Sequence, residues 1–172
     1  YRFDQFNLIK LGLLNIILGL EGTEEQAGAL GSLLNNKKKI NRGGVYSNVS
    51  LNMEGLVLSS GLRYERMQNA GGRLVYKAGA KFVLGQLDTR VNFSSGFKAP
   101  NLYHYFASSG ANLDLKPEKS ESFDVSLFYQ SHLLNMTLSY FGTEYDDYIN
   151  YVFNNNNNSL SRYENIDSAS IK

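Results

Sequence analysis

The residues best suited to contact a ligand stand together between two predicted strands, near the middle of the chain. Tyr103, His104, Tyr105 and Phe106 supply three aromatic rings and an imidazole at four consecutive positions. Such rings could stack against an aromatic metal chelate, and a neutral imidazole could be an axial ligand of iron. The rings could equally pack the connection against itself. Both interpretations stay open, and the four residues form the candidate ligand-binding site.

Nothing in the sequence predicts catalysis at these positions. There is no Ser/His/Asp constellation, phosphate-binding glycine loop or HExxH motif, so we expect no enzyme. The sequence has no cysteine and two histidines, which excludes a disulfide framework, a thiolate metal site and a histidine-rich metal cage. Asp146 and Asp147 resemble a calcium pair only superficially and are interpreted as a solvated strand end. We therefore expect no resident cofactor and no metal site.

Composition narrows the class of protein further. The net charge of +1 gives no general attraction to nucleic acid, and the basic run at 37–39 is interpreted as a solvated loop. Aromatic residues make up 13% of the chain, with 12 Tyr, 10 Phe and only two Pro, which favours strands over helices. The longest apolar run, 8–20, is too short for a membrane helix, which needs about 20 residues, whereas a transmembrane strand needs only about 10.

Apolar and polar residues alternate with a period of two over most of the chain, which indicates strands. Val45, Val49 and Leu51 share one face, for example, while Tyr46 and Asn48 share the other. We expect an all-β antiparallel up-and-down meander of about nine strands. The expected strands are 2–9, 14–26, 45–53, 56–65, 73–82, 87–97, 123–129, 134–152 and one from about 162, with loops at 28–41, 98–121 and 153–160.

Three features favour a membrane barrel over a soluble sandwich. Connections alternate between tight turns and long loops, as in outer-membrane barrels, with 68–72 as an exception. The polar faces carry charges in mid-strand, which a wet barrel interior accommodates: Arg63, Lys77, Lys81, Asp88, Arg90 and Asp124. Aromatic residues of the apolar face fall near the long-loop rim, as in an interfacial girdle: Tyr64, Tyr76, Phe97 and Phe123. A soluble β-sandwich binding module remains the alternative.

Two motifs flank the candidate site. The first is Gly96, Phe97, Lys98, Ala99 and Pro100, and the second contains Leu115, Lys116, Pro117 and Glu118. Their order and spacing resemble a signature of TonB-dependent outer-membrane receptors, in which a strand ends in Gly-Phe-Arg/Lys-Ala-Pro and the chain returns through a Leu-Lys-Pro-Glu-Lys-Ser-like stretch. Weaker likenesses extend the resemblance to roughly 42–172, at Leu62-Arg63-Tyr64, Tyr140-Phe141 and Tyr163-Glu164-Asn165-Ile166.

The resemblance implies a fold, a location and a set of partners. The fold is a roughly 22-stranded transmembrane β-barrel, of which residues 1–172 would be a partial barrel domain without the plug domain or the N-terminal and C-terminal barrel strands. Members of the family import ferric siderophores, haem or cobalamin across the bacterial outer membrane. The implied partners are outer-membrane lipid and lipopolysaccharide, a small-molecule metal chelate, and TonB through a plug domain that is not in this chain.

The two motifs and His104 receive different roles. Pro100 is expected to end a strand, because it cannot donate to the ladder, and Pro117 to fix the return of the loop, so both motifs are architectural. Haem receptors of this family carry a ligating histidine in the same connection, which makes His104 a candidate haem ligand. Their second motif usually contains Asn-Pro-Asn/Asp-Leu, however, and here 111–115 has no proline. A barrel of another class, such as a porin, adhesin or autotransporter, remains an alternative to the receptor.

Overall fold

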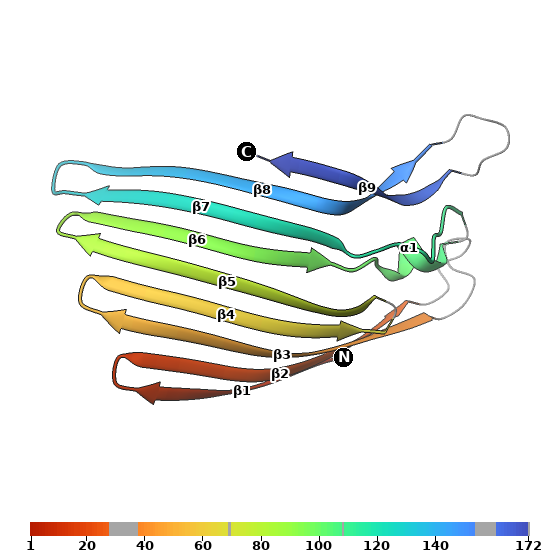
Figure 1. Ribbon diagram of the computed structural model, residues 1–172, viewed down its shortest axis with the longest axis horizontal. Coiled ribbons are helices and arrows are strands. Elements are labelled where there is room, and N and C mark those ends of the chain that lie inside the picture. The colour runs from red at the N-terminus through yellow and green to blue at the C-terminus, as the bar shows by residue number, and fades with distance from the viewer. Residues whose placement is uncertain (28–37, 69, 108, 154–160, 172) are drawn as a thin grey trace.

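A single antiparallel sheet makes up almost all of the structure (Figure 1). The computed structural model describes residues 1–27, 38–68, 70–107, 109–153 and 161–171, and the structural statements below concern these residues. Nine strands pair strictly in chain order, as the alternation predicts. They are β1 (Arg2–Leu11), β2 (Leu14–Ala27), β3 (Lys38–Met53), β4 (Leu56–Met67), β5 (Gly71–Leu84), β6 (Leu87–Lys98), β7 (Glu118–Gln130), β8 (Asn135–Val152) and β9 (Arg162–Ile171).

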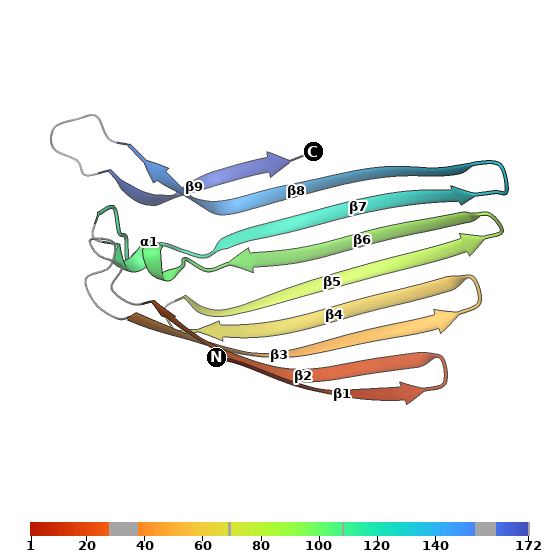
Figure 2. The ribbon, with the colours of Figure 1, turned by 180° about the vertical axis from the view of Figure 1, so that it is seen from behind.

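The two ends of the sheet differ in the length of their connections. Tight turns join β1 to β2, β3 to β4, β5 to β6 and β7 to β8 at one end, and most of the longer connections lie at the other (Figures 1 and 2). Gly12, Gly55 and Gly85 have φ of +59°, +72° and +58° in three of these turns. Glycine adopts this left-handed region without steric cost, so these residues close the turns. The predicted asymmetry of the two rims is confirmed.

Cross-strand register places the predicted apolar positions on one side of the sheet, called here the apolar face. Leu20, Val45, Tyr64 and Leu74 are successive neighbours across β2 to β5, and their exposed fractions run from 47% to 59%. The opposite side, called the polar face, carries the predicted mid-strand charges. A sandwich needs a second sheet over the apolar face. The described residues form one sheet only, so the sandwich interpretation is wrong for them.

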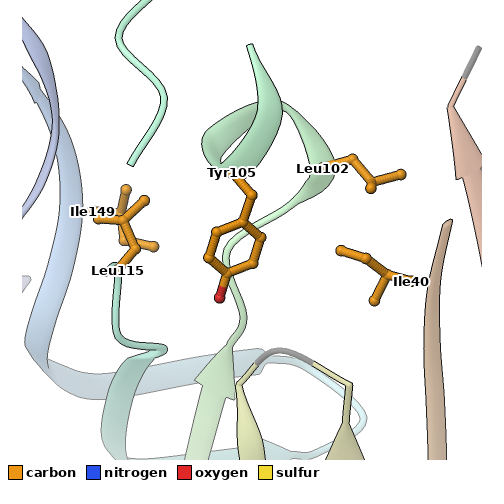
Figure 3. Packing of buried hydrophobic residues seen from close by; sticks show 5 residues of the cluster. All are labelled: Ile40, Leu102, Tyr105, Leu115 and Ile149. Carbon is orange, nitrogen blue, oxygen red and sulfur yellow. The ribbon is translucent and has the colours of Figure 1, made fainter. Parts of the chain in front are cut away.

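The buried core of the described chain is small and lies at the end with the long connections. Its members are Ile40, Leu102, Tyr105, Leu115 and Ile149. Two come from the strands β3 and β8, two from a short helix α1 (Leu102–Phe106), and one from the return to β7. Figure 3 shows Tyr105 between Leu102 and Ile40 on one side and Leu115 and Ile149 on the other. This cluster holds the connection between β6 and β7 onto the sheet.

Two strand boundaries and one helix differ from the sequence prediction. β3 begins at Lys38, so the loop predicted at 28–41 is wrong for 38–41, and 28–37 lie outside the described residues. β7 begins at Glu118 rather than near 122, and the helix α1 lies inside the connection predicted as a loop at 98–121. Backbone pairing extends both strands beyond the alternating region, since Ala27 pairs with Lys38 and Lys98 with Glu118. None of the described helices is long and apolar enough to cross a membrane.

Candidate functional site

The residue before helix α1 fixes where the helix begins. Asn101 caps it, because its side-chain oxygen accepts a hydrogen bond from the backbone N–H of His104 at 2.9 Å. The His104 Nδ1 atom in turn accepts from the backbone N–H of Asn101 at 3.4 Å, which completes a capping box. Pro100 precedes the cap, and β6 has already ended at Lys98. The sequence Lys98-Ala99-Pro100-Asn101 therefore stops a strand and starts a helical turn.

The predicted ligand residues separate into buried and exposed members. Tyr105 is only 3% exposed and belongs to the core cluster, and Phe106 is half-buried and packs against that cluster. Burial raises the pKa of the Tyr105 phenol, and its hydroxyl has no hydrogen-bond partner among the described residues. Tyr103 is 40% exposed and His104 is half-buried. Of the four, Tyr103 offers the largest fraction of its side chain to a ligand, and Tyr105 offers almost none.

Two aromatic residues that were not predicted as ligand residues complete the site. Tyr163, at the start of β9, lies against the ring of His104 with centroids 4.7 Å apart and edge-on to Tyr103 at 6.1 Å. Tyr151 of β8 packs edge-on against Tyr163 at 5.0 Å. The pairing of β8 with β9 brings Tyr151 opposite Tyr163. No local pattern could have revealed that the ring of Tyr163 meets Tyr103 and His104, which lie about sixty positions earlier in the chain.

The hydrogen bond at His104 defines the proton's position on the ring. A neutral imidazole that accepts at Nδ1 carries its proton on Nε2. Desolvation by burial lowers the pKa of His104 and nearby Lys98 lowers it further, whereas Glu118 acts in the opposite direction. Coordination of iron through Nε2 would move that proton and break the bond from Asn101. This geometry works against haem ligation at His104, which remains an untested prediction.

The loop between α1 and β7 is fastened to β9 by main-chain and amide hydrogen bonds. The backbone N–H of Tyr163 donates to the carbonyl of Gly110 at 3.0 Å, and the carbonyl of Tyr163 accepts from the Asn112 amide at 2.8 Å. The Asn165 side chain bonds both the N–H and the carbonyl of Lys116, each at 2.9 Å. These bonds hold the loop across the ends of β8 and β9.

The second motif anchors the return of the chain. Leu115, Pro117 and Glu118 are buried, and Lys116 is exposed. The Glu118 carboxylate accepts from the backbone N–H of Ile149 at 3.1 Å and pairs with the ammonium of Lys98 at 3.2 Å. In the first motif, Gly96 and Phe97 lie in β6, next to Ser120 and Lys119 of β7. These contacts are consistent with architectural roles for both motifs. Glu118 is more deeply buried than a member of a solvated ion pair would be.

The polar face carries a ladder of ion pairs below this loop. Arg63 pairs with both Glu21 and Glu65, whose side chains are only 10% and 9% exposed. Lower on the sheet, Asp88 pairs with Lys81 at 3.1 Å and with Arg90 at 3.2 Å. Charges at such spacing on one side of a membrane-length sheet suit a wet interior and not hydrocarbon. Among the described residues, no group of three or more acidic or histidine side chains could hold a metal ion.

The family model "TonB dependent receptor-like, beta-barrel" matches residues 5–172. The chain belongs to the TonB-dependent receptor family. It is 24% identical over 112 residues to the vitamin B12 transporter BtuB of Vibrio cholerae, an alignment that covers 64% of this chain and 17% of that protein. The chain thus spans well under two thirds of the length of the curated relatives it matches. The predicted resemblance is confirmed.

Solved receptors share the fold of this receptor segment. The siderophore receptor PirA of Pseudomonas aeruginosa superposes with a TM-score of 0.86 at 20% identity, over 99% of this chain and 34% of that one. The ferric enterobactin receptor PfeA of the same organism gives 0.84 at 19%, over 98% and 31%. The hemophore receptor HasR of Serratia marcescens gives 0.79 at 16%, over 97% and 37%. The nine-stranded meander is therefore a receptor-barrel segment, whose sheet is open at β1 and β9.

Proposed function

We propose that this chain is an internal part of an outer-membrane receptor that imports a small metal chelate, energised by TonB through a plug domain outside this sequence. The cargo would be a ferric siderophore, haem or cobalamin. The observation that carries the proposal is the family match over nearly the whole chain, together with the open sheet that a complete barrel would close. The apolar face would lie against outer-membrane lipid, because its large apolar side chains are uncovered.

The chemistry of the candidate site supports a role in the receptor's outer vestibule. The long-connection end presents Tyr103, half-buried His104 and the neighbouring Tyr163 on a loop that is fastened to the sheet. Aromatic rings offer large contact area with little loss of conformational freedom. A planar or aromatic chelate would find such a surface there, and Tyr105 and Phe106 would support it from below. No catalytic step is part of this proposal.

Energised uptake by the complete receptor tests the proposed function. Cells that express the whole gene would be supplied separately with ferric siderophores, haem or cobalamin, with and without a functional TonB. Accumulation of one of the three that requires TonB is the expected result. Uptake that continues without TonB would refute the proposal, as would TonB-dependent uptake of none of the three.

A matched pair of variants tests the site itself. Tyr103→Ala should weaken binding of the imported chelate about fivefold, the scale of one lost aromatic contact. Leu113→Ala removes a more exposed side chain, 69% against 40% for Tyr103, from the same connection and should leave binding unchanged. Equal effects of the two substitutions would remove Tyr103 from the site without touching the transport proposal.

A further inference from the structure

The ladder between β5 and β6 stops well before the two strands end. Its last pair is Lys77 and Ser94, although both strands continue beyond this pair toward the long connections. The neighbouring ladders do continue, since β4 pairs with β5 as far as Gly71 and β6 pairs with β7 as far as Lys98. The outer ends of β5 and β6 diverge (Figures 1 and 2). The space between these two unpaired strand ends is called here the outer gap.

Completion of the barrel would leave the outer gap as it is. Each of the two strands already has its second neighbour in this chain, β4 beside β5 and β7 beside β6, and further strands would join at β1 and β9 instead. A cavity of about 230 Å³ occupies the gap. Its lining includes Arg73 and Gly96 of the polar face as well as Leu74 and Phe97 of the apolar face. The cavity therefore lies within the wall rather than on one of its faces.

The gap begins at the outer boundary of the membrane. Leu74, which would pair with Phe97 if the register continued, lies ten residues before Leu84, the last residue of β5. Ten residues span about 33 Å along a strand. At a strand tilt of about 40° this is roughly 25 Å of height, the full height of an apolar band of about 25 Å. Backbone groups in hydrocarbon need partners, so a ladder can stop only where water reaches it, and the position of the gap meets this requirement.

Tyr76 joins the two sides of the wall just below the gap. The Ser95 hydroxyl of β6 accepts from the backbone N–H of Tyr76 at 2.9 Å and donates to its carbonyl at 3.4 Å. The Tyr76 hydroxyl donates to Oε1 of Glu121 on β7 at 3.0 Å. The Tyr76 ring also lies against Phe93 of β6, with centroids 5.9 Å apart. One residue of β5 is thus held by side chains of two other strands.

A second contact joins the two sides at the outer end, where α1 reaches β3. Leu102 of α1 packs beside Ile40 of β3 in the core cluster (Figure 3). The rest of the connection is fastened to its own side, since Glu118 bonds Ile149 of β8 and the loop bonds β9. The helix α1 and the outer ends of β6 to β9 therefore form one unit, called here the α1 side.

We propose that the barrel wall opens along the outer gap, that Tyr76 holds it closed, and that the α1 side moves as one unit relative to β3, β4 and β5. The ladder below the gap can stay intact, because the contacts described across the gap are made by side chains. Segments with few buried contacts open at a low cost in free energy. The moving unit carries Tyr103, His104 and Tyr163, so its position would set the width of the outer vestibule. This consequence rests on the proposed function, whereas the opening requires the receptor barrel alone.

Distances between spin labels in the complete receptor, placed in nanodiscs, test this inference. The residues described here contain no cysteine, and the only cysteines of the receptor would be the two that carry the labels. The pair Arg66→Cys/Leu113→Cys spans the gap. The pair Leu113→Cys/Ser168→Cys lies within the α1 side and serves as the reference. All three labelled residues are exposed and therefore tolerate a label.

Two tyrosine variants are compared with the wild type in both label pairs. Tyr76→Phe removes the hydroxyl that bonds Glu121 and keeps the ring. Tyr64→Phe is the matched control, because Tyr64 is 47% exposed on the same face and its hydroxyl makes no hydrogen bond among the described residues. We expect Tyr76→Phe to raise the population of longer distances across the gap about fivefold, the scale of one net hydrogen bond. Distances within the α1 side should not change, and Tyr64→Phe should match the wild type.

Two results would overturn the proposal. One is the same distance distribution across the gap in all three proteins, with heat-modifiable electrophoretic migration verifying that each is folded. The other is an equal broadening of both label pairs in Tyr76→Phe, which would show unfolding of the connection instead of movement of one unit. Uptake by the same proteins separates the opening from the transport function. Unchanged distances with normal uptake refute the opening alone, and the expected distances without TonB-dependent uptake refute the transport function alone.

Discussion

Glu118 is expected to stabilise the outer loop through one backbone hydrogen bond more than through its ion pair. Its side chain is 6% exposed and accepts from the N–H of Ile149, whereas its partner Lys98 is 65% exposed. A hydrogen bond to a charged group contributes about 1.5–3 kcal/mol, and an ion pair with an exposed partner about 0–1 kcal/mol. Glu118→Ala would also leave a buried N–H without an acceptor. We expect this substitution to destabilise the region by about 3 kcal/mol.

Amide hydrogen exchange in the complete receptor measures this effect where it occurs. A loss of about 3 kcal/mol corresponds to roughly a hundredfold faster exchange at Ile149. Glu118→Gln keeps a neutral acceptor and should cost only about 1 kcal/mol. Lys98→Met removes the ion pair and should cost less than about 1 kcal/mol. Were Lys98→Met to accelerate exchange as much as Glu118→Ala, the ion pair would be the main contributor and the reasoning above would be wrong.

Changes at three further residues test the packing of the connection. Tyr105→Phe removes a buried hydroxyl that has no partner among the described residues, so it should be neutral or stabilise by up to about 1 kcal/mol, whereas Tyr105→Ala should cost about 3–5 kcal/mol in thermal or denaturant unfolding. Gly110→Ala should destabilise the loop by at least about 1 kcal/mol in the same assay, because Gly110 has φ of +74° and a Cβ there would meet Tyr151 at 2.6 Å; an unchanged midpoint would show that the loop relaxes freely. Burial lowers the pKa of His104 below its usual 6.5, so the unfolded state binds the proton first and loop stability should fall as pH drops below about 6.5, levelling off below the folded-state pKa. Exchange at α1 followed against pH should show this, and His104→Gln should flatten the profile; a wild-type profile as flat as that of the variant would contradict the assignment.

The strands were predictable because alternation is a local signal. Apolar and polar residues alternate through 45–53 and 56–64, so each residue can be assigned to one face of the sheet. Gly55, which has a positive φ, marks the turn between the two strands. The inward direction of Arg63 and Lys77 follows from the same period. Each of these features depends on residues within one hairpin, so a single sequence contains enough information to place them.

The candidate site was less predictable because its contacts are long-range. A helix of five residues such as α1 has no periodicity to recognise, and its direction determines that Tyr105 is buried while Tyr103 is exposed. Glu118 is charged and lies in a polar stretch, which favours a solvated interpretation. Its burial depends on the N–H of Ile149, thirty-one residues away. The ring of Tyr163 reaches His104 only because β8 and β9 pair.

The fastening of the loop to β9 has a consequence for how the barrel is completed. In an antiparallel ladder the N–H and C=O of one residue point to the same side. Both main-chain groups of Tyr163 bond the loop at Gly110 and Asn112, so they face away from β8. A strand that pairs with the outer edge of β9 therefore cannot hydrogen-bond to the backbone of Tyr163. Its ladder must begin nearer Asn165. In a complete barrel the ladder beside β9 would therefore be interrupted at this end, because the loop at Gly110 and Asn112 occupies the hydrogen-bonding position of a neighbouring strand.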